Sequence, residues 1–152
     1  MIGAFLDSLR QARLRKSKDP AQADGRRGED LAHRSLQRKG FVIVARNYRL
    51  PSSDGEADVI AWDGDTLVFV EVKSRESGDY GPPDRAIGPE KLNDTVRVAR
   101  AYARKTDTPW DRIRFDVVSV LLSDPPAIEH FPGVRISRRS GGPGFGHPLS
   151  LR

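Results

Sequence analysis

Four charged residues in two neighbouring segments have types and spacing that suit chemistry. Glu56 and Asp58 begin one segment, and Glu71 and Lys73 end the next. Both segments are rich in β-branched and other apolar residues, which predicts two strands. Because side chains alternate between the two faces of a strand, Glu56 shares a face with Asp58, and Glu71 shares a face with Lys73.

A turn between the two segments would bring these side chains together. Asp63-Gly64 is a typical two-residue hairpin turn, and it predicts the register of the pair. Glu56 then lies opposite Glu71. Asp58 lies opposite Phe69 and diagonal to Glu71, at roughly 7–8 Å. A three-residue turn would change this parity unless a bulge restored it.

Three acids on one face of a sheet repel one another unless a cation is present. Hard carboxylate oxygens select Mg²⁺ or Mn²⁺. Lys73 adds a fixed positive charge that can position a water or stabilise developing charge. The set suits metal-assisted hydrolysis of a phosphodiester, with Asp58, Glu71 and Glu56 as metal ligands. An edge-strand ion pair is the structural alternative for Glu71 and Lys73.

Other charged residues have two interpretations each. Glu29 is either a first-turn acid favoured by a helix dipole or part of the site. Glu56 is either a metal ligand or a solvated acid. Asp116, within a largely apolar strand, is predicted to be a structural hydrogen-bond acceptor rather than a metal ligand. Five basic residues either line a phosphate-binding surface or are solvated: Arg46, Arg49, Arg75, Lys91 and Arg97.

These residues need a scaffold, and the hydrophobic pattern predicts a compact α/β domain with a mixed sheet. Gly40 is expected to end the first helix, and Pro89 suits the first turn of the second. The expected helices cover residues 25–39 and 89–105. The expected strands cover residues 41–45, 56–62, 65–73 and 113–122, with a short edge strand at 127–131.

Composition limits the class of protein. The 152 residues suit one domain, and the absence of cysteine excludes disulfides and cysteine metal sites. No apolar run approaches the roughly 20 residues that cross a bilayer, and no secretory signal is evident. We therefore expect a cytoplasmic protein that does not bind membranes.

The net charge of +5 is concentrated at the two ends of the chain. Residues 1–24 are expected to form a basic arm or short helix with a linker at Asp19-Pro20. Residues 25–134 form the α/β domain, and residues 135–152 form a disordered, basic, Gly/Pro-rich tail. Residues 28–134 hold 15 basic and 18 acidic residues, so net charge does not support nucleic-acid binding by this domain. The tails either contact phosphates or are merely solvated.

The sequence resembles the bacterial YraN family of endonuclease-like proteins, over residues 25–134. The resemblance rests on segments that occur in order: Gly28-Glu29-Asp30-Leu31-Ala32, Lys39-Gly40-Phe41, Ala45-Arg46-Asn47-Tyr48-Arg49, Gly55 to Ala61, Asp63 to Arg75, and Arg114 to Val118. It implies a restriction-endonuclease-like fold, with a central mixed sheet flanked by helices in α-β-β-β-α-β order. It also implies that Asp58, Glu71 and Lys73 occupy the acid and lysine positions of that superfamily. Glu29 matches an acid often found near such sites.

The resemblance leads to a functional expectation with two alternatives. The leading hypothesis is a Mg²⁺-dependent or Mn²⁺-dependent endonuclease that acts on branched or structured DNA in repair or recombination. In it, Arg46, Arg49, Arg75 and Lys91 bind the nucleic acid. The alternatives are a non-catalytic nucleic-acid-binding module and an adaptor for a repair or replication protein. A homodimer is compatible with the resemblance.

Overall fold

The computed structural model describes residues 20–51, 55–76 and 89–135. Its elements are α2 (Pro20–Arg38), β1 (Val42–Arg49), β2 (Glu56–Asp63), β3 (Thr66–Glu76), α3 (Pro89–Lys105), the 3₁₀ helix η1 (Trp110–Arg112), β4 (Ile113–Leu122) and β5 (Ala127–Phe131). No helix in these ranges is both long enough and apolar enough to cross a membrane.

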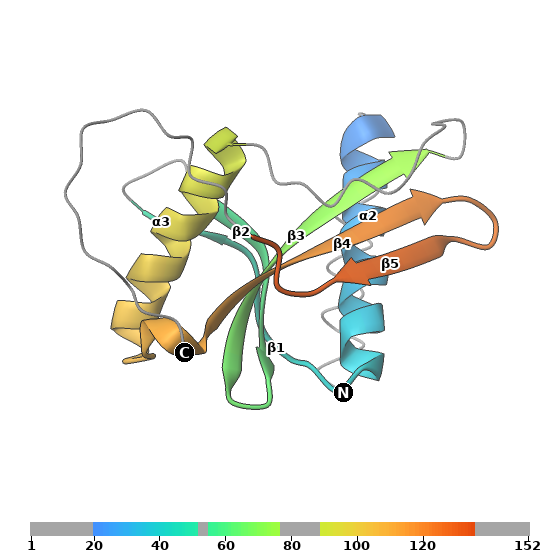
Figure 1. The fold of residues 1–152 in the computed structure, drawn as a ribbon. Coiled ribbons are helices and arrows are strands. Elements are labelled where there is room, and N and C mark those ends of the chain that lie inside the picture. Colours follow the sequence, from blue (N-terminus) through green and yellow to red (C-terminus); the bar gives the residue numbers. More distant parts are fainter. Residues whose placement is uncertain (1–19, 52–54, 77–88, 136–152) are drawn as a thin grey trace, which may run out of the picture.

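The five strands form one mixed sheet in the order β1-β2-β3-β4-β5. β3 and β4 are parallel, and the other neighbouring pairs are antiparallel. α3 makes the crossover between the two parallel strands, as such a connection requires. The helices lie on opposite sides of the twisted sheet, which gives three layers (Figure 1). The predicted fold class and order of elements are confirmed.

Each face of the sheet buries its own apolar cluster. On the α2 side, Ala32 and Leu36 pack against valines of β2, β3 and β4. On the α3 side, Val98 and Ala99 pack against Ile60, Phe69 and other residues. β4 is buried on both faces from Phe115 to Val120, as its largely apolar pattern predicted.

The first helix differs from the prediction at its start. α2 begins at Pro20, so residues 20–24, which were expected in a linker, are helical. Proline suits the first turn because its missing N–H would have no partner there. The predicted end is confirmed: Gly40 has a φ of +90°, and the N–H of Phe41 donates to the carbonyl of Leu36 at 3.1 Å. This is the Schellman pattern of a glycine-terminated helix.

The hairpin register differs by two residues from the prediction. Asp63 pairs with Thr66, so the turn is Gly64-Asp65, with Gly64 at a φ of +61°. The ladder continues to Val59 and Val70, and the same register places Asp58 beside Glu71. Asp58 is therefore not opposite Phe69. The shift is an even number of residues, so Asp58 and Glu71 keep the same face.

The start of β2 also departs from strict alternation. Glu56 is not opposite Glu71, because it pairs with Arg49 of β1. Ala57, expected on the face of Val59, packs instead in the α3-side cluster. On β1, the residue between Arg46 and Tyr48 is Asn47, with a φ of +48°. The pairing register is unbroken across Asn47, from the Arg46/Val59 pair to the Tyr48/Ala57 pair, and the one register shift of this strand pair lies between Ile43 and Ala45.

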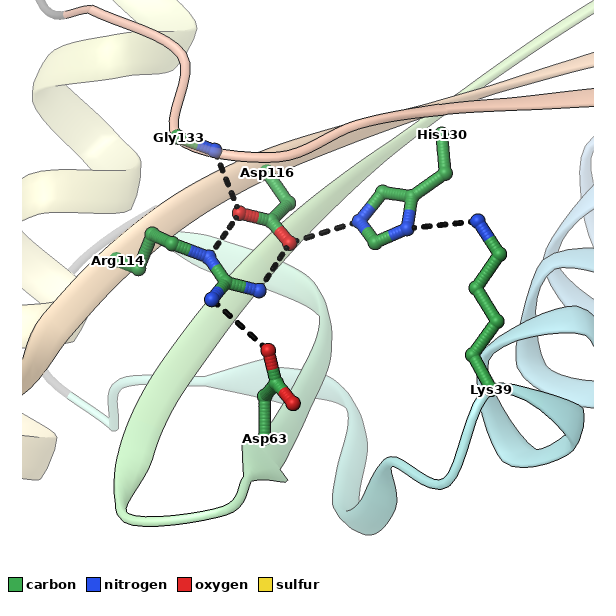
Figure 2. Close-up of polar contacts among 6 residues, drawn as sticks. All are labelled: Lys39, Asp63, Arg114, Asp116, His130 and Gly133. Atoms are coloured by element: carbon green, nitrogen blue, oxygen red, sulfur yellow. Dashed lines mark hydrogen bonds and ion pairs between the residues drawn. The ribbon is translucent and has the colours of Figure 1, made fainter.

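A polar network centred on the buried Asp116 joins β4 to β5, to the segment after β5 and to the end of β2 (Figure 2). Asp116 is fully buried and accepts hydrogen bonds from Arg114, His130 and the Gly133 N–H at 2.8–3.0 Å. Arg114 also donates to Asp63 at 2.9 Å. The predicted structural role of Asp116 is confirmed. Burial alone would raise the pKa of Asp116, but these hydrogen bonds hold it below its usual value.

Candidate active site

A cavity of about 440 Å³ lies between the first half of α2 and the end of β3. Its walls come from both helices and from three strands. The lining residues are Asp24, Gly25, Glu29, Asp58, Glu71, Val72, Ser74, Arg75, Glu76, Lys91 and Leu122. The structure therefore brings Glu29, Asp58 and Glu71, which were predicted for one site, into one cavity.

Asp58 is fixed where β2 separates from β3. The last backbone pair is Val59 with Val70, and the Val72 N–H then donates to Asp58 Oδ2 at 2.8 Å. The carboxylate takes the place of a backbone acceptor in the ladder. A side chain that is held by the backbone of a strand is oriented more rigidly than one on a surface loop.

Lys91, in the first turn of α3, lies between the two acids. Its Nζ is 3.9 Å from Asp58 Oδ1 and 3.6 Å from Glu71 Oε2. The Asp58 and Glu71 side chains are 10% and 13% exposed, whereas that of Lys91 is 38% exposed. The ammonium group of Lys91 is thus the counter-ion of two partly buried carboxylates, and its predicted contact with nucleic acid stays a prediction.

The protonation of the site follows from this crowding. Burial and the nearby charge of Asp58 raise the pKa of Glu71 to about 7, although Lys91 opposes the shift. Burial lowers the pKa of Lys91, but Asp58, Glu71 and Glu56 more than offset that effect and hold it above its usual value. A group that titrates near neutral pH inside a cavity is typical of functional sites.

Glu29 enters the cavity from α2 and is held by two residues of β1. Asn47 donates to Glu29 Oε2 at 3.1 Å, and Arg46 lies 3.7 Å from the same oxygen. Arg46 also donates to Asp30 at 2.6 Å. Burial raises the pKa of Glu29, as do Asp58 and Glu56, while Asn47 and Arg46 lower it. The Arg46 side chain is 14% exposed and contacts these acids, and its predicted contact with nucleic acid stays a prediction.

The remaining predicted residues lie around the cavity. Lys73 follows Glu71 on the same face of β3, opposite Ser119 of β4 and outside the described lining. Glu56 pairs with the exposed Arg49 at 2.8 Å, at the edge formed by β1. Arg75 lines the cavity. The functional roles of these residues stay predictions.

The close approach of α2 to β3 depends on Gly28. A Cβ atom at this position would lie 1.7 Å from the Ser74 hydroxyl oxygen, so no side chain fits without movement. The contact brings the first half of α2 against the end of β3, where both line the cavity. Sequence reasoning singled out neither Ser74 nor Asn47. Only asparagine's tolerance of positive φ could have marked Asn47 as a special position.

The donor set suits a divalent cation that keeps much of its water. Within the described residues, no three acidic or histidine side chains converge closely enough to hold a metal ion unaided. Asp58 and Glu71, however, already share one cation, the Lys91 ammonium group. Mg²⁺ is commonly held by one or two carboxylates together with waters and substrate phosphates. The two acids therefore fit such an ion.

Comparison with known proteins places these residues in a family. The model of "Uncharacterised protein family UPF0102" matches residues 28–120, which include Glu29, Asp58, Glu71 and Lys91. The chain belongs to this family. UPF0102 is the YraN family that the sequence resembles, so the predicted family is confirmed. UPF0102 proteins of Solibacter usitatus and Pseudarthrobacter chlorophenolicus are 49% and 46% identical to it. The alignments cover 80% and 72% of this chain, and 91% and 83% of those proteins.

Among solved structures, a Holliday junction resolvase from Archaeoglobus fulgidus is similar to the UPF0102 chain. The match covers 70% of this chain and 74% of the resolvase, with 22% sequence identity and a TM-score of 0.47.

Proposed function

We propose that this UPF0102 protein is a Mg²⁺-dependent or Mn²⁺-dependent endonuclease that cleaves structured DNA, with Asp58 and Glu71 holding the metal. The observation that carries the proposal is the pair of partly buried carboxylates that share one cation in an open cavity. The pKa of Glu71 is raised to about 7 even though Lys91 lies beside it. A divalent cation, with twice the charge, would therefore stabilise the ionised form of both acids more than the ammonium group does.

Each residue has a role that its position supports. When bound, the metal ion polarises a phosphate oxygen and lowers the pKa of a water. Asp58 on β2 and Glu71 on β3 would hold that ion from two neighbouring strands of the sheet. Lys91 turns from the acids to a substrate phosphate, which it can do because its side chain is partly exposed. Arg75 adds a second positive charge on the cavity wall.

A cleavage assay tests the proposal. Purified protein is incubated with branched, flap and single-stranded DNA in Mg²⁺ or Mn²⁺, beside Asp58→Asn and Glu71→Gln. Glu129→Gln is the matched control, because Glu129 is exposed on β5 and outside the cavity. We expect wild type and Glu129→Gln to cut at least one substrate, and the two site variants to lose at least a hundredfold in rate. Equal behaviour of all four proteins would contradict the catalytic role.

One observation favours a second candidate, a nucleic-acid-binding module without catalysis. Lys91 already supplies a positive charge to both Asp58 and Glu71, so the fold holds these acids in an internal ion-pair cluster without a metal ion. This alternative predicts binding that depends on salt, survives EDTA and is not followed by cleavage. Substrate left intact by wild-type protein under all metal conditions would favour it.

A further inference from the structure

The outer face of α3 carries a row of arginines. Arg97, Arg100 and Arg104 recur at intervals of three and four residues, so they lie on one side of the helix. All three are exposed, and the Arg97 side chain is 55% accessible. The opposite side of the helix buries Val98 and Ala99 against the sheet. The row therefore faces solvent, away from the cavity acids.

Trp110 extends this row beyond the end of the helix. It is 46% exposed, and the Arg100 guanidinium group lies 5.6 Å from its ring centroid. Phe115 supports the ring from the core side, with centroids 6.2 Å apart and rings inclined at 57°. Contact with the core therefore buries only part of the indole ring. The remainder is presented to solvent beside a guanidinium group.

The local charge differs in sign from that of the surrounding domain. Residues 93–112 hold five basic and three acidic residues, within a region (28–134) that has 15 basic and 18 acidic residues. Of the three acids, Asp94 pairs with Arg97 at 3.6 Å. Asp107 and Asp111 lie near the end of the row. Residues 93–112 therefore carry a net positive charge within a slightly acidic domain, as do residues 31–53, which hold five basic and no acidic residues.

The row is connected to the candidate active site through the helix itself. Lys91 contacts the cavity acids in the first turn of α3, and Arg104 lies 13 residues further along. At about 1.5 Å per residue, the helix spans roughly 20 Å between them. Figure 1 shows α3 running alongside the sheet on the side opposite to α2, and the chain then continues through η1, which carries Trp110, into β4.

We propose that this surface, formed by Arg97, Arg100, Arg104 and Trp110, binds an unpaired strand of the nucleic-acid substrate. The arginines contact phosphates, and a base stacks on the indole in place of the Arg100 guanidinium group. A fully paired duplex offers no free base to the indole, so charge complementarity and an exposed aromatic ring together favour a single strand. The inference rests on the proposed function, whose substrate class it narrows to DNA with a single-stranded segment.

Binding in EDTA tests this surface without metal or cleavage. The probe is a fluorescein-labelled oligothymidylate of 20 nucleotides, compared with a 20-base-pair duplex. We expect Trp110→Ala to weaken oligothymidylate binding roughly tenfold or more, and Trp110→Phe to retain most of it, because stacking needs an aromatic face. Oligothymidylate should quench tryptophan fluorescence in wild type, with the quenching lost in Trp110→Phe, which leaves only Trp62.

The arginines are tested through the salt dependence of binding. Arg100→Ala combined with Arg104→Ala should lower the slope of log affinity against log salt by about 1.4, the value for two lost phosphate contacts on a single strand. The control is Arg34→Ala combined with Arg38→Ala, because these arginines are exposed on α2, across the sheet. Both double variants change exposed side chains only, so they keep the test valid if Trp110→Ala fails to fold.

The outcomes separate this surface from the proposed chemistry. Unchanged affinity in Trp110→Ala and in the Arg100/Arg104 variant would overturn the proposal, as would equal loss in the α2 control. Cleavage without any effect of these variants would reject the surface and leave the proposed function standing. Trp110-dependent binding without cleavage in Mg²⁺ or Mn²⁺ would reject the proposed function alone.

Discussion

Glu71 governs how the candidate site responds to pH. Its pKa in the folded protein is about 7, above the ordinary value of 4.5. A carboxyl group with a raised pKa is protonated in the folded state and ionised in the unfolded state between these pH values. The metal-free protein should therefore lose stability as pH rises from about 4.5 to about 7, by an amount on the order of 3 kcal/mol.

Urea denaturation in EDTA at pH 5 and pH 8 tests this prediction. Glu71→Gln carries no ionisable group there, so its free energy of unfolding should fall less than that of wild type between the two pH values. Glu129→Gln, at an exposed position, should follow wild type. Parallel pH profiles for wild type and Glu71→Gln would show that burial does not shift this carboxyl group.

Lys91 should compete with a divalent cation for the two acids. Its Nζ lies within 4 Å of both carboxylates, where a bound metal ion would be repelled by it. Lys91→Met should therefore tighten Mn²⁺ binding, by roughly tenfold if about 1.4 kcal/mol of repulsion is removed. Calorimetric titration with Mn²⁺ at pH 8.5, where Glu71 is ionised, measures this effect directly.

Lys105→Met is the matched control for this titration, because Lys105 is exposed at the other end of α3. It should leave Mn²⁺ affinity within about twofold of wild type. Weaker Mn²⁺ binding in Lys91→Met than in wild type would mean that Lys91 supports the metal site rather than competing with it.

At the scale of elements, the contact between α2 and β3 depends on a missing side chain. Gly28→Ala forces Ser74 to move, because the added Cβ atom would lie 1.7 Å from its hydroxyl oxygen. Overpacking of this kind costs about 1–3 kcal/mol. The added atom at Gly25, in the same helix, meets nothing within 4 Å. Gly25→Ala should therefore stabilise the protein by roughly 0.5–1 kcal/mol.

Chemical denaturation of the two variants distinguishes packing from helix propensity. Both replace glycine with alanine in α2, so propensity alone would shift both free energies in the same direction. Opposite signs are expected. Stabilisation by both substitutions would show that the helix can move away from the strand without loss.

The elements could be predicted from sequence where a local pattern decides them. The apolar run of β4 and the glycine that ends α2 are such cases. The hairpin register could not, because Asp63-Gly64 and Gly64-Asp65 both satisfy the preferences of a tight turn. The pairing of whole strands selects between them. The error of two residues preserved parity, so the expected face of Asp58 and Glu71 was correct.

The sequence could predict which acids form the site, but not the residues that contact those acids. Period-two alternation is a local rule, and it brings Asp58 near Glu71. The contact of Lys91 with both acids depends on how α3 packs across the sheet, which no local pattern specifies. The support of Glu29 by Asn47 likewise joins α2 to a left-handed residue of β1.

At the scale of the whole molecule, Asp116 connects four parts of the chain. Its partners lie on β4, on β5 and in the segment after β5, and Arg114 extends the network to the β2–β3 hairpin. Asp116→Asn removes a buried charge that Arg114 needs, which should cost about 3 kcal/mol of unfolding free energy at pH 7. Asp65→Asn, at an exposed turn position, is the control.

The pH dependence of this cost provides a further check. The pKa of Asp116 is lower in the folded protein than its usual 3.8, so its stabilisation is complete above that pH and is lost as pH falls through the folded value. The difference between wild type and Asp116→Asn should therefore shrink below about pH 4. A constant difference down to pH 2 would assign the effect to shape rather than charge.

The hydrogen bond from the Leu50 N–H to the Gly55 carbonyl, at 3.3 Å, has a practical consequence. It closes the connection between β1 and β2 at its base, just before the strand that carries Asp58. The chain between these two residues can therefore change in length while the strand on either side stays in place. This makes the connection a suitable insertion point for an epitope or a fluorophore-binding peptide, through which the protein could be followed in living cells with its acids undisturbed.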